Sequence, residues 1–309
     1  MPWRSNGDRL FHGITALAGC AILIILAGIL IILFNASLIS FSKFGFGFFF
    51  SSDWNPVKGE FGAISSVFGT LVSTFIALLI ALPLSIMIAL FLVEYAPPYI
   101  SIPVGFAIEL LAAIPSIVYG MWGLFVLAPF LAKHVIPNLQ RITGHSFIFG
   151  GKVIGGQGVF TAGVILAIMI VPYITSVMRD VFRMVPDVLR ESGFGMGATR
   201  WEVTKNIMLP ASLRGLVGAT FLGLGRAVGE TMAVTFVIGN GHNFTTQIFR
   251  EGNTIASTLA NDFGEAADQP LFYGVLLELA LILFAITIVL QVASNWWIRH
   301  LGRKSGVLK

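Results

Sequence analysis

Long unbroken runs of apolar residues constrain the fold of this 309-residue chain more than any other feature. Charged residues make up only 11% of the sequence, whereas a soluble domain carries about 25%. Six runs are long enough to cross about 30 Å of hydrocarbon at about 1.5 Å of rise per helical residue. They lie at 14–34, 64–93, 102–131, 159–182, 211–239 and 271–298. The sequence therefore predicts an all-α polytopic membrane protein with six transmembrane helices.

The first run follows Arg4 and Arg9, as the apolar part of a secretory signal would. It is too long for a signal, and no small-residue cleavage site follows it. We expect a retained anchor helix and an external loop in 1–63, a transmembrane domain in 64–298, and a basic cytoplasmic tail in 299–309. The longest segments between runs have roughly 30 residues and cannot bury a core alone, so no separate soluble domain is expected.

The positions of Lys and Arg predict the orientation of the chain. With six spans both termini share one side, which then holds twelve Lys and Arg against six on the other side. Because such residues accumulate in cytoplasmic segments, both termini are expected in the cytoplasm. This distribution also explains the net charge of +4. No basic stripe alternates with aromatic residues, so we expect no binding of nucleic acid.

Several kinds of site are absent from the sequence. Cys20 is the single cysteine, which excludes an intrachain disulfide and a multi-cysteine metal site. The five histidines lack metal-binding spacing. The stretch "FGGKV" at 149–153 fails the nucleotide-binding pattern G-x-x-x-x-G-K-[ST] at its last position. We therefore expect no cofactor in this chain and no hydrolysis of ATP by it.

The segment 183–210 predicts two short helices joined by a glycine turn. Pro186 and Asp187 suit the first turn of a helix. The run "GFGMG" at 193–197 should end that helix, because glycine tolerates positive φ. Thr199 and Glu202 then form a capping box that starts a second helix. Periodicity alone leaves open the alternative of an ordinary amphipathic surface loop.

The same segment resembles the cytoplasmic signature of ABC importer permeases, which reads E-A-A, three residues, G, nine residues, I-x-L-P. The spacing matches throughout, and Ser and Gly replace the two alanines. The matching residues are Glu191, Ser192, Gly193, Gly197, Ile207, Leu209 and Pro210. The resemblance implies coupling helices at about 186–208 that dock in a groove of an ATPase subunit. Leu189, Phe194 and Met196 would be the protruding apolar contacts.

Three further stretches resemble the permease family of phosphate-specific ABC importers of the PstC type. They are Ala81–Pro97, Ala112–Leu127 and Gly223–Asn240. The resemblance implies a type I ABC importer permease fold in the bacterial inner membrane and inward transport of inorganic phosphate by alternating access. It implies a PstA-like permease, a PstB-like ATPase dimer that binds ATP and Mg, and a PstS-like phosphate-binding protein as partners. A PstA-type subunit and a permease for sulfate or molybdate are the alternatives.

Arg226 and Glu230 lie inside the fifth run, where an Arg costs about 2.5–3.5 kcal/mol on insertion scales. Four residues apart on one helix, they would share a face. One interpretation is a structural salt bridge. The other is a path for an anion, because a guanidinium presents a fork of donors that suits phosphate oxygens. Glu230 would then accept the proton of hydrogen phosphate or hold Arg226 in place. The resemblance favours the anion path.

Glu109 and Glu278 are weaker candidates for the substrate pathway. Both lie inside predicted spans, and for each an inter-helix hydrogen bond or a protonated structural role is the favoured interpretation. A passive anion channel or an ion-coupled carrier would also use Arg226 and Glu230, but neither needs the coupling segment. An intramembrane enzyme would need paired catalytic groups, which the spacing does not provide. We therefore expect a transport subunit and not an enzyme.

Overall fold

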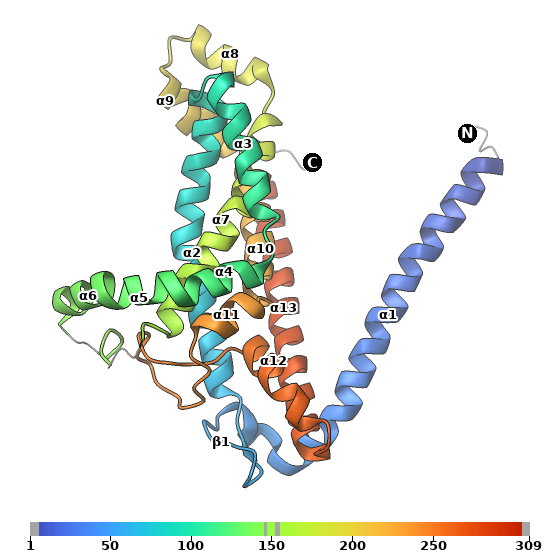
Figure 1. Cartoon of the computed structure of the whole chain (residues 1–309). Helices are drawn as coiled ribbons and strands as arrows, with labels where there is room; N and C mark the ends of the chain where they lie inside the picture. Colours follow the sequence, from blue (N-terminus) through green and yellow to red (C-terminus); the bar gives the residue numbers. More distant parts are fainter. Residues whose placement is uncertain (1–5, 145–146, 152–154, 305–309) are drawn as a thin grey trace.

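A computed structural model describes residues 6–144, 147–151 and 155–304 (Figure 1). Arg4, Lys152 and the end of the basic tail lie outside these residues. The α-helices are α1 (Asn6–Phe44), α2 (Ile64–Leu90), α3 (Pro98–Ala112), α4 (Ser116–Trp122), α5 (Ala128–Phe130), α6 (Ile136–Thr143), α7 (Val159–Arg183), α8 (Asp187–Gly195), α9 (Arg200–Val203), α10 (Leu209–Val228), α11 (Met232–Val237), α12 (Ile255–Ala266) and α13 (Pro270–Lys304). The remaining elements are the 3-10 helix η1 (Gly45–Phe49), the π-helices η2 (Phe91–Tyr95), η3 (Gly123–Leu127), η4 (Leu131–Val135) and η5 (Thr204–Met208), and an antiparallel pair of strands, β1 (Trp54–Asn55) and β2 (Glu60–Phe61).

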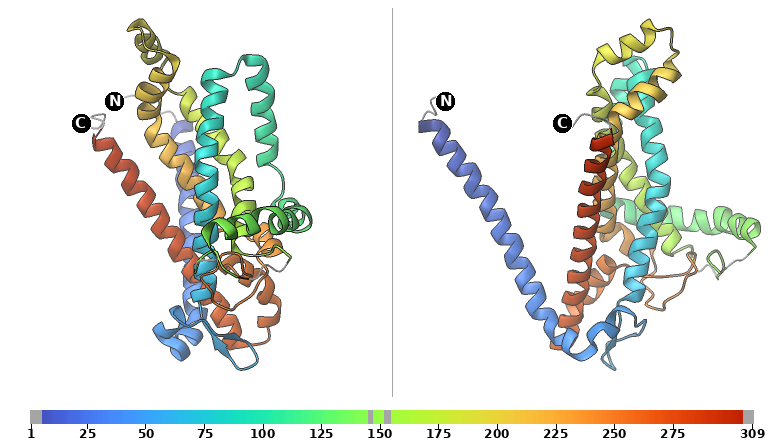
Figure 2. Two further views of the ribbon diagram at one scale, coloured as in Figure 1. Left: turned by 90° about the vertical axis from the view of Figure 1, so that its left-hand side faces the viewer. Right: turned by 180° about the vertical axis from the view of Figure 1, so that it is seen from behind.

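Within the described residues, six helical segments are long and apolar enough to cross a membrane, which confirms the predicted number. They are Leu10–Phe49, Ile64–Tyr95, Ser116–Thr143, Val159–Arg183, Arg200–Val228 and Pro270–His300. The helices α2, α7, α10 and α13 form a bundle (Figures 1 and 2). In the most apolar 18-residue stretch of α7, 67% of the residues are buried, whereas none of the corresponding stretch of α1 is buried. The helix α7 is therefore the centre of the bundle.

The two ends of the bundle differ in what they carry. The helices α8 and α9 lie at one end, called the α8 end here, and β1, β2 and α12 lie at the other, called the β1 end. The start of α1 and the end of α13 both lie toward the α8 end (Figure 2). Such an arrangement agrees with an even number of crossings.

The third predicted span, 102–131, is wrong as a single helix. The helix α3 ends at Ala112, and α4 begins only after Pro115. Proline lacks the N–H group that would continue the helix, and it disfavours helical backbone at the residue before it. The segment from α4 to α6 then runs across the bundle, while α3 runs along it (Figure 1). The span that follows the break is Ser116–Thr143, and Pro98–Ala112 is a separate, shorter apolar helix.

The helix α1 leaves the bundle at the β1 end and diverges from it toward the α8 end (Figure 2). It contacts α13 near the β1 end, where Gly274 on α13 approaches the Ala36 carbonyl on α1. Most large apolar side chains of α1 are exposed, Leu17 by 72% and Ile24 by 71%. Within the part of the chain that the structure describes, most of this 39-residue helix therefore has no packing partner.

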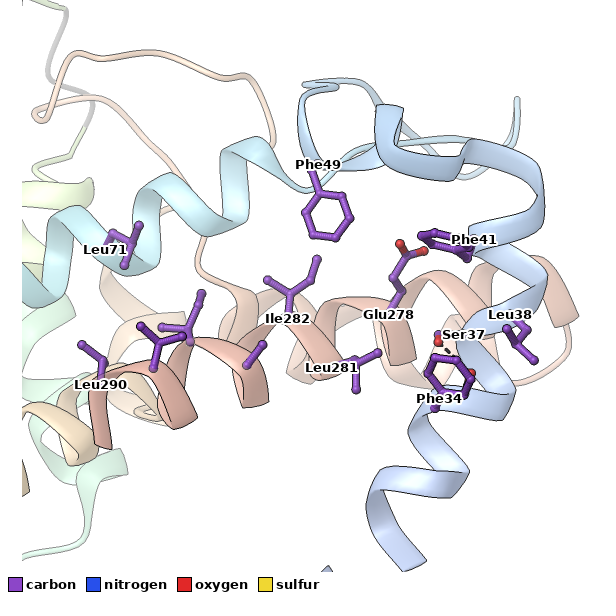
Figure 3. Close-up of a pocket in the computed structure, with 13 residues that line it drawn as sticks. Phe34, Ser37, Leu38, Phe41, Phe49, Leu71, Glu278, Leu281, Ile282 and Leu290 are labelled. Carbon is purple, nitrogen blue, oxygen red and sulfur yellow. Dashed lines mark hydrogen bonds between the residues drawn. The ribbon is translucent and has the colours of Figure 1, made fainter. Parts of the chain in front are cut away.

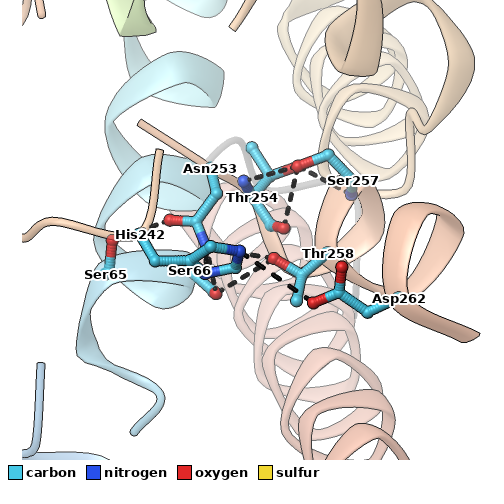
Figure 4. A network of polar contacts seen from close by, with 8 residues as sticks. All are labelled: Ser65, Ser66, His242, Asn253, Thr254, Ser257, Thr258 and Asp262. Atoms are coloured by element: carbon cyan, nitrogen blue, oxygen red, sulfur yellow. Dashed lines mark hydrogen bonds and ion pairs between the residues drawn. The ribbon is translucent and has the colours of Figure 1, made fainter. Parts of the chain in front are cut away.

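A buried polar network holds the β1 end together around Asn253 (Figure 4). The Ser65 hydroxyl donates to the Asn253 side-chain oxygen at 2.7 Å, and the Asn253 amide donates to Ser66 at 2.7 Å and Thr258 at 3.0 Å. These bonds join α2, α12 and the loop between α11 and α12. Buried polar groups that are satisfied in this way rigidify a fold, whereas unsatisfied ones destabilise it.

Gly69→Ala is expected to destabilise this end of the molecule. An added Cβ at Gly69 would lie 1.9 Å from the Asn253 carbonyl oxygen, a backbone atom that no rotamer change can move. Overpacking of this kind costs about 1–3 kcal/mol or more. Thermal unfolding of the purified protein measures the effect. Gly264→Ala in α12, where nothing lies within 4 Å, is the matched control and should be neutral or stabilising. Equal melting temperatures for the two variants would contradict the close approach.

His242 should make the stability of the β1 end depend on pH. Its ring stacks on Trp54 with a centroid distance of 4.7 Å, and burial lowers the pKa of His242 from 6.5 to about 4. Below pH 6.5 the His242 ring takes up a proton in the unfolded chain but stays neutral in the folded chain. The free energy of unfolding therefore falls as the pH drops from 6.5 toward 4. Burial raises the pKa of Asp262, whose carboxylate lies 3.9 Å from His242, and this opposes part of the loss. Melting temperatures at about pH 7.5 and about pH 5 should differ less in His242→Gln than in the wild type. Identical pH dependence would contradict the assignment.

Candidate substrate pathway and coupling segment

The fifth predicted span, 211–239, is also two helices, and its break lies beside the candidate arginine. The helix α10 ends at Val228 and α11 begins at Met232. Arg226 lies in the last turn of α10, whereas Glu230 lies in the connection. The prediction that the two side chains share one helix face is therefore wrong. They form no ion pair within the described part of the chain.

The Glu230 carboxylate caps α11. It accepts a hydrogen bond of 3.2 Å from the backbone N–H of Ala233. Gly229, next to it, has a low helix propensity and follows the last residue of α10. An acid that satisfies a free N–H at a helix start, together with a glycine before it, accounts for the break. Glu230 thus shapes the connection, and among the described residues Arg226 has no acidic ion-pair partner.

Arg226 is half-buried and faces aromatic side chains. Its guanidinium lies 5.3 Å from the ring centroid of Tyr173 on α7, in a cation–π contact. Tyr119 on α4 is buried and donates a hydrogen bond of 2.9 Å to the Leu111 carbonyl on α3. A guanidinium stacked on a ring keeps the donors on its edge available for an anion. Sequence reasoning missed Tyr173, because nothing local marks it as a neighbour of Arg226.

Close packing between helices brings the two breaks together. An added Cβ at Gly120 on α4 would lie 3.0 Å from the Ala233 Cα on α11. At Gly223, one turn before Arg226, an added Cβ would lie 2.4 Å from the Ile174 side chain on α7. Irregular backbone at membrane depth is tolerated only where it is buried in protein or lines a cavity. Interrupted helices form the ion and substrate sites of many membrane proteins.

The coupling segment has the predicted helix, turn and helix. The helix α8 ends at Gly195, and Gly197 adopts a φ of +84°. The Thr199 side chain accepts from the Glu202 N–H, and the Glu202 carboxylate accepts from the Thr199 N–H, which confirms the capping box. The second helix continues through η5 into α10, so Pro210 lies inside the span Arg200–Val228.

The motif residues contact one another across the turn. An added Cβ at Gly193 would lie 2.7 Å from the Ile207 side chain and 2.9 Å from Val203, so a small residue is required there. This contact explains why the position after Glu191 and Ser192 carries a small residue, which is glycine here and alanine in the motif. The apolar side chains of Leu189, Phe194 and Met196 are exposed by 42%, 45% and 82%. The segment therefore presents an apolar surface on a compact support.

Glu109 on α3 and Glu278 on α13 form no ion pair with Arg226 among the described residues. Glu109 on α3 pairs with Arg179 on α7, a buried arginine that sequence reasoning counted only toward orientation. Glu278 on α13 is 3% exposed, and neither of its oxygens has a hydrogen-bond partner in the described structure. It lines a groove of about 580 Å³ between α1 and α13 (Figure 3). The role of either acid in the substrate pathway stays a prediction.

The chain is similar to known transport proteins over nearly its whole length. The family model of the binding-protein-dependent transport system inner membrane component matches residues 61–306. The phosphate transport system permease protein PstC of Pasteurella multocida is 48% identical over 303 residues, which cover 97% of this chain and 94% of the relative. The PstC protein of Haemophilus influenzae is 46% identical and covers 97% of this chain and 95% of its own.

Two solved structures share the fold at low sequence identity. A bacterial alginate ABC transporter in complex with its alginate pentasaccharide-bound periplasmic protein has a TM-score of 0.63 at 18% identity, covering 95% of each chain. The inward-facing MetNI methionine ABC transporter has a TM-score of 0.52 at 20% identity, covering 78% of this chain and 94% of its own. The chain thus has the type I ABC importer permease fold, and it belongs to the binding-protein-dependent transport system inner membrane component family, among the PstC permease proteins.

Proposed function

We propose that this chain is the membrane-spanning permease subunit of an ATP-driven importer that moves inorganic phosphate inward by alternating access. The coupling segment carries this proposal, because a channel or an ion-coupled carrier needs no docking element for an ATPase. Two observations support phosphate as the substrate. The relatives are named phosphate transport permease proteins, and the Arg226 guanidinium suits phosphate oxygens. Both termini lie in the cytoplasm together with α8 and α9, in agreement with the excess of Lys and Arg at that end.

Arg226 is the residue that phosphate meets in the pathway. Its guanidinium stays charged at every relevant pH and offers paired donors to phosphate oxygens. The contact with the Tyr173 ring orients the Arg226 guanidinium and leaves its positive charge unpaired by an acid among the described residues. Glu230 holds the start of α11 in place, so that the break beside Arg226 keeps its shape.

A second permease of the PstA type supplies the other half of the pathway. The exposed length of α1 and the groove between α1 and α13 are surfaces that a helix of this partner covers (Figure 3). A donor on that helix would hydrogen-bond to the Glu278 carboxylate, whose polar neighbour among the described residues is the Ser40 hydroxyl on α1. In a membrane such a polar contact favours helix association, because the alternative is an unsatisfied group in hydrocarbon.

An ATPase dimer of the PstB type binds ATP and Mg and docks against α8 and the turn that follows it. The exposed Phe194 and Met196 suit an apolar groove on that subunit. A phosphate-binding protein of the PstS type delivers the substrate at the β1 end. Closure of the ATPase dimer then moves α8 and α9 as a rigid body and opens the pathway to the opposite side.

Uptake of labelled phosphate by vesicles that contain all four components tests the proposed function. Uptake should require ATP and the binding protein, and excess unlabelled phosphate should compete while sulfate and molybdate should not. Competition by sulfate or molybdate at equal concentration would assign a different oxyanion. Uptake without ATP would assign a channel or a carrier instead.

A further inference from the structure

An ion pair joins the coupling helix α8 to the end of α2. The Arg190 guanidinium lies on α8, and its Nη1 is 3.2 Å from the Glu94 carboxylate in η2, which continues α2. Its Nη2 donates a hydrogen bond of 3.0 Å to the Phe182 carbonyl at the end of α7. The Arg190 side chain on α8 therefore contacts both α2 and α7, two of the long helices of the bundle. Asp187, at 3.9 Å and 84% exposed, is a peripheral neighbour.

The pair is shielded from water. The side chain of Glu94 is 9% exposed and that of Arg190 is 20% exposed. Exposed ion pairs contribute little, because water screens them and both side chains lose freedom. A shielded pair differs, since removing one partner leaves the other charge uncompensated in a poorly solvated place. This contact therefore ties α8 to the end of α2.

The end of α2 is in turn fixed to α3 and α7. The Ser101 hydroxyl on α3 donates to the Leu92 carbonyl at 2.7 Å, and Glu109 on α3 pairs with Arg179 on α7. Gly105 on α3 lies against the Arg179 guanidinium, where an added Cβ would be 2.3 Å from Nη1. A displacement of α8 is therefore passed to α2, α3 and α7 together, and α7 carries Tyr173 beside Arg226.

We propose that the Arg190–Glu94 pair is the positioning contact through which α8 exchanges motion with the transmembrane bundle. The inference rests on the proposed function, because it assigns the route by which the ATPase and the substrate pathway communicate. Arg190 acts through α2 and α7 and touches no substrate. The pair is expected to work in both directions, so the loaded binding protein on the far side accelerates ATP hydrolysis through it.

The test compares the wild-type chain with four variants, each in the assembled complex with the partner permease, the ATPase and the binding protein. ATPase activity is measured with and without phosphate-loaded binding protein, beside phosphate uptake and melting temperature. Glu94→Gln and Arg190→Gln should each lower the stimulation of ATPase by about fivefold or more, while basal ATPase remains. Each should also lower the melting temperature, because one charge is left without its partner.

The double variant Glu94→Leu with Arg190→Met separates a positioning role from a structural one. It removes both charges, so the melting temperature should return toward the wild-type value. Stimulation and uptake should stay lost, because the connection is still missing. Recovery of stimulation together with stability would overturn the inference. Arg183→Gln, an exposed arginine near the end of α7, is the matched control and should leave all readouts unchanged.

Failure of the proposed function has a different signature. A wild-type complex that takes up no phosphate would contradict the proposed function and this inference with it. A wild-type complex that transports phosphate beside a double variant that keeps full stimulation would contradict this inference alone.

Discussion

Arg226→Gln is expected to abolish phosphate uptake while the loaded binding protein still stimulates ATP hydrolysis. The variant keeps the side chain as far as Cδ with a polar end, and it loses the charge and the fork of donors. Two hydrogen bonds to a charged group contribute about 3–6 kcal/mol together, so uptake should fall about 100-fold or more. The break between α10 and α11 should persist, because Glu230 and not Arg226 caps α11. Vesicle uptake and ATPase activity are recorded in the same samples.

Two further variants sharpen the test of Arg226. Arg226→Lys keeps the charge but offers no planar fork, so uptake should be intermediate. Tyr173→Phe keeps the aromatic face that stacks on Arg226 and should transport close to the wild type. Normal uptake by Arg226→Gln would mean that Arg226 is structural. Loss of both activities with poor assembly would point to a packing role for its contact with Tyr173.

Gly197→Ala is expected to lower uptake and the stimulation of ATPase together. Gly197 has a φ of +84°, where a residue with a Cβ is disfavoured by about 1–2 kcal/mol. Relief of this strain would redirect the chain between α8 and the capping box at Thr199 and Glu202. The apolar surface of Phe194 and Met196 would then no longer match the ATPase groove.

Gly195→Ala is the matched control for this turn. Gly195 is the last residue of α8, has no positive φ, and has open space where a Cβ would lie. Its substitution should leave coupling intact. If Gly195→Ala and Gly197→Ala behaved alike, the turn would not be the element that sets coupling. Because Arg226→Gln is expected to retain stimulation and Gly197→Ala to lose it, one assay should distinguish the two sites.

The coupling segment could be predicted from sequence because its determinants are local. Thr199 and Glu202, which form the capping box, are three residues apart, and the glycines of the turn lie within five consecutive residues, 193–197. Its spacing identified the motif, and only the contact between Gly193 and Ile207 needed the structure. The number of spans was predictable for a similar reason, since hydropathy over a window of about 20 residues decides it.

The breaks and the ion pairs could not be predicted in the same way. Hydropathy stays high across Pro115 and Gly229, so each of the two runs has the pattern of one continuous helix. In the structure each run is two helices, and α4 packs against α11 close to both breaks. Pro83, by contrast, lies inside α2 without interrupting it, so proline alone does not decide the outcome. The pair of Glu94 and Arg190 joins residues far apart in the chain, and no spacing rule connects them.

The accumulation of phosphate against its own gradient tests the central claim most directly. Vesicles are assembled with this chain, its partner permease, the ATPase and the binding protein, and the phosphate concentrations on both sides are measured over time. Phosphate should rise on the α8 side above its concentration on the β1 side, only with ATP and only with the binding protein present. Concentrations that equalise and go no further, with or without ATP, would contradict the central claim.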